Sequence, residues 1–168
     1  MSIVSLGFLL LSAFITKDKD LSEYSKLQNL EYQALNDSAG KAYTVDLTHK
    51  KGCNKTRVHY LGIVHTTNGR SYKILTSFVV FSAASNCHGS SHIKVFDIRN
   101  RYIGEYRVGM PEDMPDTMKD NKLFYFKSTE DCMLKTTRSI DLHKGLPKKI
   151  FINCSKNESN EHTFSSGD

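Results

Sequence analysis

The sequence contains none of the short motifs that mark an enzyme active site or a cofactor site. It has no Gly-x-Ser-x-Gly, no glycine-rich phosphate loop and no dinucleotide fingerprint. The Asp-x-Asp-x-Asp-Gly spacing of an EF-type calcium loop is also missing. No basic run is interleaved with aromatic residues, so the sequence does not favour a nucleic-acid-binding protein. We therefore expect no cofactor and no metal, and a binding protein more than an enzyme.

A hydrophobic run long enough for a confident membrane span is missing too. The uncharged residues 1–16 contain one apolar stretch, Ile3–Ile15, whereas a spanning helix needs about 20 apolar residues. This length fits the apolar core of an export signal, although no Lys or Arg precedes it. We expect residues 1–16 to be a signal peptide and the protein to be secreted or periplasmic. A membrane anchor, if the segment stays uncleaved, and a buried first element are the alternatives.

Basic residues are concentrated in the middle of the chain. Residues 41–108 hold eleven Lys or Arg against three Asp or Glu, a local charge of +8, whereas residues 17–40 carry −2 and residues 109–168 carry −1. A basic surface attracts anionic partners such as acidic glycans. Scattered charges that only keep the surface soluble are the alternative. The candidate binding residues, chosen for their charge, are Lys50, Lys51, Lys55, Arg57, Arg99 and Arg101.

Four cysteines occur at wide spacings, an even number that indicates two disulfides in an exported protein. Three pairings are possible. We favour Cys132–Cys154 and Cys53–Cys87, because Cys132 follows one strand-like segment and Cys154 ends another. Each bridge is expected to stabilise the fold by about 2–4 kcal/mol.

One helix is predicted near the start of the domain. Apolar residues recur at helical spacing within residues 20–35, from Leu21 to Ala34, and a polar, glycine-containing stretch follows. A partly ordered tether over residues 17–40 is the alternative.

Two hairpins are predicted after the helix. Asn68-Gly69 lies between two long strand-like segments and is a strong hairpin signal, with a two-residue turn that pairs Thr67 with Arg70. A second hairpin aligns Ile93 with Val108.

The remaining segments complete a β-rich fold. Further strands are expected at 43–47, 123–126, 139–142 and 149–153. We interpret residues 110–121 as a loop and residues 156–168 as a disordered tail. The prediction is an all-β domain over residues 41–155, with one short N-terminal helix, whose antiparallel meander forms a small barrel or a sandwich.

The segment 82–92 is the most suggestive for chemistry. It contains Cys87, His88 and His92, which are metal ligands or a nucleophile and its base in other proteins. We read it as a Ser- and Gly-rich loop in which sequence neighbours seldom converge on one site. A hydrolase built on these three residues, or a lipocalin-like carrier of a small ligand, is the alternative.

The leading hypothesis is a small exported β domain that binds something and catalyses nothing. Its basic middle region suits an anionic glycan, an envelope component or a protein. Contact with a membrane is expected only through residues 1–16, if they remain attached.

Overall fold

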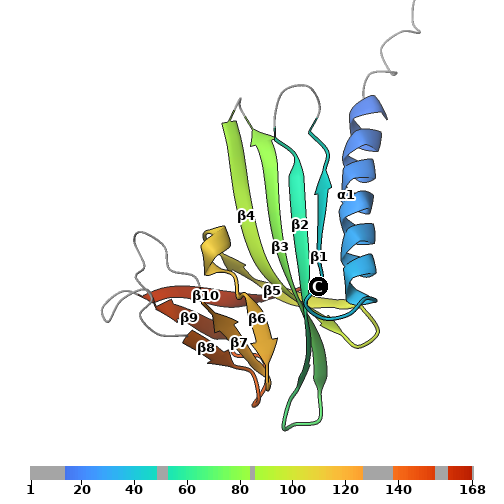
Figure 1. The fold of residues 1–168 in the computed structure, drawn as a ribbon. Coiled ribbons are helices and arrows are strands. Elements are labelled where there is room, and N and C mark those ends of the chain that lie inside the picture. Colours follow the sequence, from blue (N-terminus) through green and yellow to red (C-terminus); the bar gives the residue numbers. More distant parts are fainter. Residues whose placement is uncertain (1–13, 49–52, 84–85, 127–137, 154–158, 168) are drawn as a thin grey trace, which may run out of the picture.

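Two antiparallel sheets and one helix make up the computed structural model, which describes residues 14–48, 53–83, 86–126, 138–153 and 159–167 (Figure 1). The elements are α1 (Phe14–Leu35), β1 (Ala42–Asp46), β2 (Lys55–His65), β3 (Ser71–Ala83), β4 (Asn86–Asp97), β5 (Tyr102–Val108), the short 3-10 helix Pro111–Asp113, β6 (Thr117–Lys119), β7 (Lys122–Tyr125), β8 (Arg138–Asp141), β9 (Lys149–Asn153) and β10 (Ser159–Ser166). Within the described ranges, no helix is long and apolar enough to cross a membrane.

The predicted β-rich fold with one N-terminal helix is confirmed. Seven strands form one sheet in the order β1-β2-β3-β4-β5-β10-β9, and β6, β7 and β8 form a second sheet. The large sheet is not closed, so the barrel that we offered as one form of this fold does not occur. The two sheets instead pack on each other through an apolar core. Its fully buried members include Val64, Ile74, Val95, Tyr106, Leu123, Leu142 and Ile150.

Helix α1 covers the opposite face of the large sheet, beside β1 and β2 (Figure 1). The end of the helix inserts Ala34 and Leu35 against a second apolar cluster on the strands. That cluster consists of Val58, Tyr60, Leu75 and Phe96. Complete burial of a side chain such as Leu75 is worth about 1.5–3 kcal/mol. The helix begins at Phe14, so it includes the last residues of the segment that we assigned to export.

The first hairpin has a three-residue turn, and our prediction of a two-residue turn was wrong. The amide of Gly69 donates to the carbonyl of Thr66 (3.0 Å), and the amide of Thr66 donates to the carbonyl of Arg70 (2.9 Å). Gly69 has φ +78°, the left-handed conformation that closes such a turn. Near the turn the strands are therefore shifted by one residue, so Tyr72 lies opposite Val64 and not opposite His65. A bulge between Tyr60 and Gly62 shifts the rest of the ladder by one residue more.

The second hairpin uses the same type of turn. The amide of Asp97 donates to the carbonyl of Arg101 (2.9 Å), and Asn100 takes the left-handed position with φ +65°. This turn and a bulge between Val95 and Phe96 together pair Ile93 with Tyr106, whereas we had expected Ile93 to pair with Val108. This shift of two residues leaves Ile93 facing the core, because the side chains of a strand alternate.

The C-terminal segment is a strand and not the disordered tail that we predicted. Strand β10 lies between β5 and β9, so the large sheet extends past residue 155, where we had ended the domain. The ring of Phe164 packs on Tyr106, with 5.0 Å between the ring centres. One aromatic side chain and the backbone hydrogen bonds of two neighbours order a segment whose composition is polar. The predicted loop 110–121 likewise contains the short strand β6.

Candidate functional site

The structure divides the predicted binding residues between two ends of the large sheet. Lys55 and Arg57 lie on β2, whereas Arg99 and Arg101 lie in the turn between β4 and β5. Strand β4 separates the two groups by about 20 Å, the length of six residues in a strand. Arg101 is also committed within its own turn, since its Nε donates to Asp97 Oδ2 (2.6 Å). The predicted residues Lys50 and Lys51 lie outside the described part of the chain.

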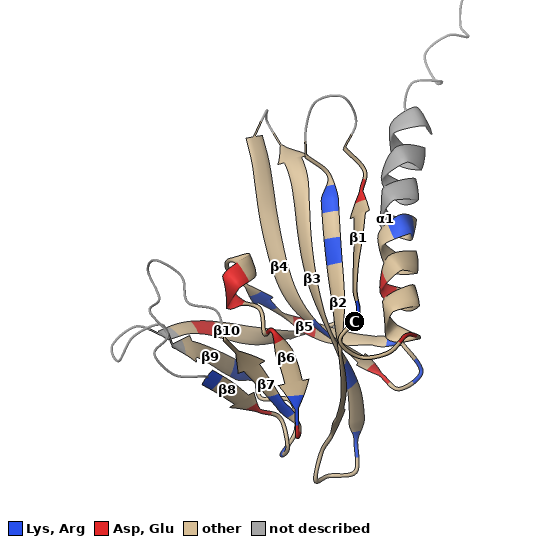
Figure 2. Cartoon of the chain, in the orientation of Figure 1, with Lys and Arg blue, Asp and Glu red and all other residues tan. Residues whose placement is uncertain are grey.

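Lys55 and Arg57 project from the face of β2 that points away from α1. Both side chains are exposed, and they alternate with the buried residues Thr56 and Val58 on the helix-facing side. Figure 2 shows the two basic positions one above the other along β2. The alternation of side chains in a strand thus brings two cations to one surface.

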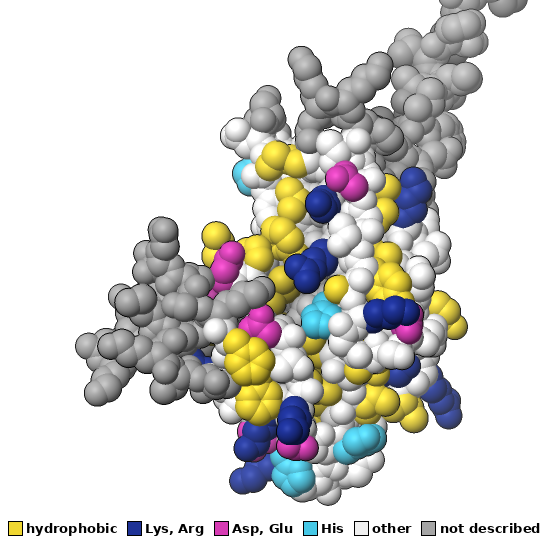
Figure 3. Space-filling model, viewed as in Figure 1, with side chains coloured by type: hydrophobic (Ala, Val, Ile, Leu, Met, Phe, Trp, Pro, Cys, Tyr) yellow, Lys and Arg dark blue, Asp and Glu magenta, His cyan; other side chains and the backbone are white. Residues whose placement is uncertain are grey.

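Apolar side chains lie beside these cations. Across the ladder, Val80 of β3 pairs with Lys55, and Phe78 pairs with Arg57; both are half-buried. The ring of Phe78 lies over Gly89 of β4, where an added Cβ would come within 2.9 Å of the ring. A space-filling view shows hydrophobic side chains next to basic ones over the upper part of β2 and β3 (Figure 3). We call Lys55, Arg57, Phe78 and Val80 the open sheet face.

The charge of the open sheet face is partly balanced at one edge. Asp46 of β1 pairs with Lys55 in the ladder, and its pKa lies below the ordinary value mainly because Thr48 donates to it, with a smaller contribution from Lys55. Arg57 pairs with Thr44, which carries no charge. Among the described residues, Arg57 has no ion pair. Across the β1–β2 ladder, the acidic neighbour therefore lies beside Lys55 and not beside Arg57.

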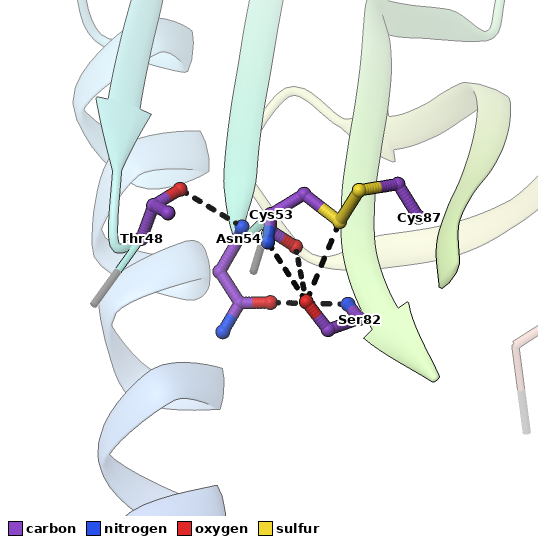
Figure 4. The surroundings of a disulfide bond; sticks show 5 residues. All are labelled: Thr48, Cys53, Asn54, Ser82 and Cys87. Atoms are coloured by element: carbon purple, nitrogen blue, oxygen red, sulfur yellow. Dashed lines mark hydrogen bonds between the residues drawn. A yellow bond between two sulfur atoms is a disulfide. The ribbon is translucent and has the colours of Figure 1, made fainter. Parts of the chain in front are cut away.

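A disulfide closes the end of this surface. Cys53 and Cys87 are bonded, with 5.8 Å between their Cα atoms, which is one of the two predicted pairs. Ser82 of β3 lies between them, and its hydroxyl accepts a hydrogen bond from the amide of Cys53 (2.8 Å; Figure 4). The disulfide links the start of β2 to the start of β4. The other predicted pair, Cys132 and Cys154, lies outside the described residues.

Residues 82–83 and 86–92 belong to strands β3 and β4, where we predicted a loop, and the residues considered for chemistry do not converge. Cys87 is in the disulfide, so its sulfur is neither a thiolate ligand nor a nucleophile. His88 stacks on Phe81, with 5.8 Å between the ring centres. His92 contacts Ser90 and Glu105 instead of Cys87 or His88. In the described ranges no three His, Cys, Asp or Glu residues are grouped for a metal ion.

His92 instead lies in a hydrogen-bonded row that sequence analysis missed. Its Nδ1 is 2.8 Å from Glu105 Oε1, and its Nε2 is 2.7 Å from Ser90 Oγ. The Glu105 carboxylate is an acceptor, so Nδ1 carries the proton and Nε2 accepts from the Ser90 hydroxyl when the ring is neutral. The hydrogen bond from His92 holds the pKa of Glu105 below its usual range. The predicted hairpin already paired these two strands, but in a register two residues away that did not bring Glu105 beside His92.

Comparisons with protein-family models, with curated proteins and with solved structures give no match. The functional argument therefore depends on the geometry of the chain itself.

Proposed function

We propose that this protein is an exported binding module that holds an acidic, partly apolar segment of another protein on its open sheet face. The observation that carries the proposal is the placement of Lys55 and Arg57 directly across from Val80 and Phe78. Two exposed cations attract carboxylates, and half-buried apolar side chains beside them can be covered by apolar groups of the same partner.

The mixed character of the surface favours a polypeptide over an anionic glycan. A sulfated or carboxylated sugar supplies anions, but it offers little apolar surface to cover Phe78 and Val80. An extended peptide presents alternate residues on one side, so a Glu followed two residues later by Phe can reach both kinds of group. The binding is expected to weaken with added salt, because Lys55 and Arg57 are exposed to solvent.

The disulfide supports the exported location. Disulfides form and persist in oxidising compartments, and Cys53–Cys87 fits such a compartment. The uncharged residues 1–16 supply the expected export signal.

A designed peptide tests the proposal. An acetylated and amidated Glu-Ser-Phe-Ser-Glu-Ser-Phe carries Glu and Phe on one side of an extended chain, and a version with Gln for Glu serves as the control. In an amide NMR titration we expect signals of β2 and β3 around Lys55 and Phe78 to shift with the first peptide and much less with the second. Heparin, an anionic glycan, is titrated in parallel. Larger shifts with heparin than with the acidic peptide, or shifts confined to the Arg99–Arg101 turn, would overturn the proposal.

A second candidate function is a serine hydrolase, favoured by the Ser90–His92–Glu105 row. Its two distances, 2.7 and 2.8 Å, join a hydroxyl, a base and a carboxylate in the order that activates a serine nucleophile. It replaces the predicted hydrolase site at Cys87, His88 and His92, from which only His92 remains.

A fluorophosphonate probe distinguishes this candidate from a structural hydrogen-bond row. Ser90 Oγ would attack phosphorus while His92 takes its proton and fluoride leaves. Labelling of the wild type that is lost in Ser90→Ala and in His92→Gln supports the hydrolase. Absence of labelling at millimolar probe would overturn the hydrolase and leave the row as structural hydrogen bonds.

A further inference from the structure

A groove of about 540 Å³ lies between the second half of α1 and the hairpin of β4 and β5. The helix contributes Leu27, Glu31 and Tyr32, and the strands contribute Lys94, Phe96 and Tyr102. The open sheet face lies on the other side of the sheet, so this groove is separate from it. Its volume is within the range of small-molecule sites, about 300–1,000 Å³.

An ion pair forms the polar part of the groove. Lys94 Nζ is 2.7 Å from Glu31 Oε1, and the two side chains are only 16% and 10% exposed. A buried ion pair loses much of its hydration, and apolar residues of similar volume are often as stable or more stable. Stabilisation of the fold alone therefore does not explain why an ion pair stands here.

Both members of the pair have unused hydrogen-bonding capacity. Glu31 Oε2 has no hydrogen bond among the described residues, and an ammonium group has three donors of which Glu31 takes one. Donor and acceptor thus stand side by side, facing a volume large enough for a ligand. A molecule that both accepts from Lys94 and donates to Glu31 can satisfy both without separating them.

Aromatic side chains supply the apolar walls. The rings of Phe96 and Tyr102 meet edge to face, with 5.7 Å between their centres, and Lys94 Nζ lies 6.0 Å from the Tyr102 ring centre. Tyr32 of α1, which is 61% exposed, forms part of the opposite wall. Flat walls of this kind favour a planar ligand that can stack.

Hydrogen bonds fix the groove at Leu35 and Asn100, two of the residues that line it. Lys73 Nζ donates to the carbonyl of Leu35 (2.8 Å) and to Asn100 Oδ1 (2.7 Å). Asn100 Nδ2 in turn donates to Asn36 Oδ1 (3.0 Å). These bonds hold the end of α1 to the β4–β5 turn, so the two walls keep their spacing before any ligand enters, which lowers the cost of binding.

We propose that this groove binds a neutral, planar aromatic molecule with a carboxamide-like edge, in which an acceptor and a donor are neighbours. Neutrality follows from the ion pair, whose net charge is zero. An anionic ligand would compete with Glu31 for Lys94 and leave a carboxylate without its partner, and a cationic ligand would do the reverse.

Three naphthalenes of nearly equal size test the proposal: 2-naphthamide, 2-naphthoate and 2-naphthylmethylamine. Their own fluorescence reports binding, because the chain has no tryptophan to interfere. We expect 2-naphthamide to bind saturably and at least tenfold more tightly than either charged analogue. Equal or tighter binding of a charged analogue, or no saturation by 2-naphthamide up to its solubility limit, would overturn the proposal.

Two variants locate the site. In Glu31→Leu/Lys94→Met the ion pair is replaced by apolar residues of similar size, so the fold is expected to persist, and 2-naphthamide should no longer bind more tightly than naphthalene. Tyr102→Ala removes a wall and should weaken 2-naphthamide at least fivefold. Ile98→Ala, at an apolar residue 60% exposed in the adjacent turn, is the control and should bind as the wild type does. If the double variant still binds 2-naphthamide more tightly than naphthalene, by the same factor as the wild type, the assignment of the site to Glu31 and Lys94 is contradicted.

Discussion

Lys73 Nζ donates a hydrogen bond to the carbonyl oxygen of Leu35, the last residue of α1, at 2.8 Å. The last carbonyls of a helix have no partner within the helix, and a cation there also opposes the negative end of the helix dipole. This single contact therefore joins the end of α1 to the middle of the large sheet.

Replacement of Lys73 by methionine removes this contact and the one to Asn100. Since hydrogen bonds to charged groups contribute about 1.5–3 kcal/mol, Lys73→Met should lower the free energy of unfolding by about that amount in a urea titration. Lys122→Met is the matched control, because the Lys122 side chain is 44% exposed and its Nζ lies 4.0 Å from Asp141 Oδ2. An exposed pair of this kind contributes little. Equal effects of the two substitutions would show that the helix end is not held by Lys73.

Removal of the disulfide should lower the free energy of unfolding by more than Lys73→Met does. The bond joins residues 34 apart, for which the chain-entropy relation gives about 4 kcal/mol. We expect Cys53→Ser/Cys87→Ser to lose about 3–4 kcal/mol of unfolding free energy. A loss below about 1 kcal/mol would contradict a bond that constrains the unfolded chain.

Acid stability should depend on Glu105. The pKa of this carboxyl is lower in the folded protein than its ordinary value of 4.5, chiefly because His92 donates to it. A lowered pKa contributes stability that is present above the unfolded value and is lost as the pH falls through the folded one. Urea titrations from pH 6 down to about pH 3 should therefore show a shallower loss of stability for Glu105→Gln than for the wild type.

His92→Leu provides the companion measurement for the same contact. It removes the hydrogen-bond donor to Glu105, so it should flatten the same part of the pH profile. A wild-type slope in both variants would contradict the contact between His92 and Glu105.

Docking of the C-terminal strand can be tested at Gly104. An added Cβ there would lie 2.3 Å from the carbonyl oxygen of Ser165 in β10, and the residue has φ +156°. Gly104→Ala should thus destabilise the protein by about 3 kcal/mol or more, since it combines backbone strain with a clash. Gly40→Ala, with φ +89° and no atom within 4 Å, isolates the strain and should cost about 1 kcal/mol. Equal losses would mean that β10 does not lie against β5.

Local sequence patterns predicted where helices and strands lie better than they predicted which strands pair and in what register. The apolar spacing from Leu21 to Ala34 gave the helix, and Asn68-Gly69 placed the first hairpin at the right residues. The turn type was missed because one left-handed glycine serves a three-residue turn as well as a two-residue one. Strand β10 was missed because its order comes from β5 and β9, not from its own composition.

For the candidate sites too, the sequence identified single residues but not the neighbours that the fold brings to them. Charge alone selected Lys55 and Arg57, and strand alternation places both on one surface, but their apolar neighbours depend on the register with β3. The pairing of Glu31 with Lys94 joins residues 63 positions apart, and the contact of His92 with Glu105 joins two strands. Residue spacing carries no signal for the first contact, and the second depends on a register that the predicted hairpin did not have.

The central claim, that Lys55 and Arg57 on the open sheet face hold an acidic partner segment, is tested most directly by the dissociation constant of the Glu- and Phe-containing peptide for two charge-reversed variants. Lys55→Glu/Arg57→Glu should weaken binding at least tenfold, about 1.4 kcal/mol. Lys144→Glu/Lys148→Glu makes the same change in net charge at exposed residues of another loop, and its dissociation constant should stay within twofold of the wild type. Equal weakening in both variants would show that the peptide responds only to overall charge, and it would contradict a binding site on this surface.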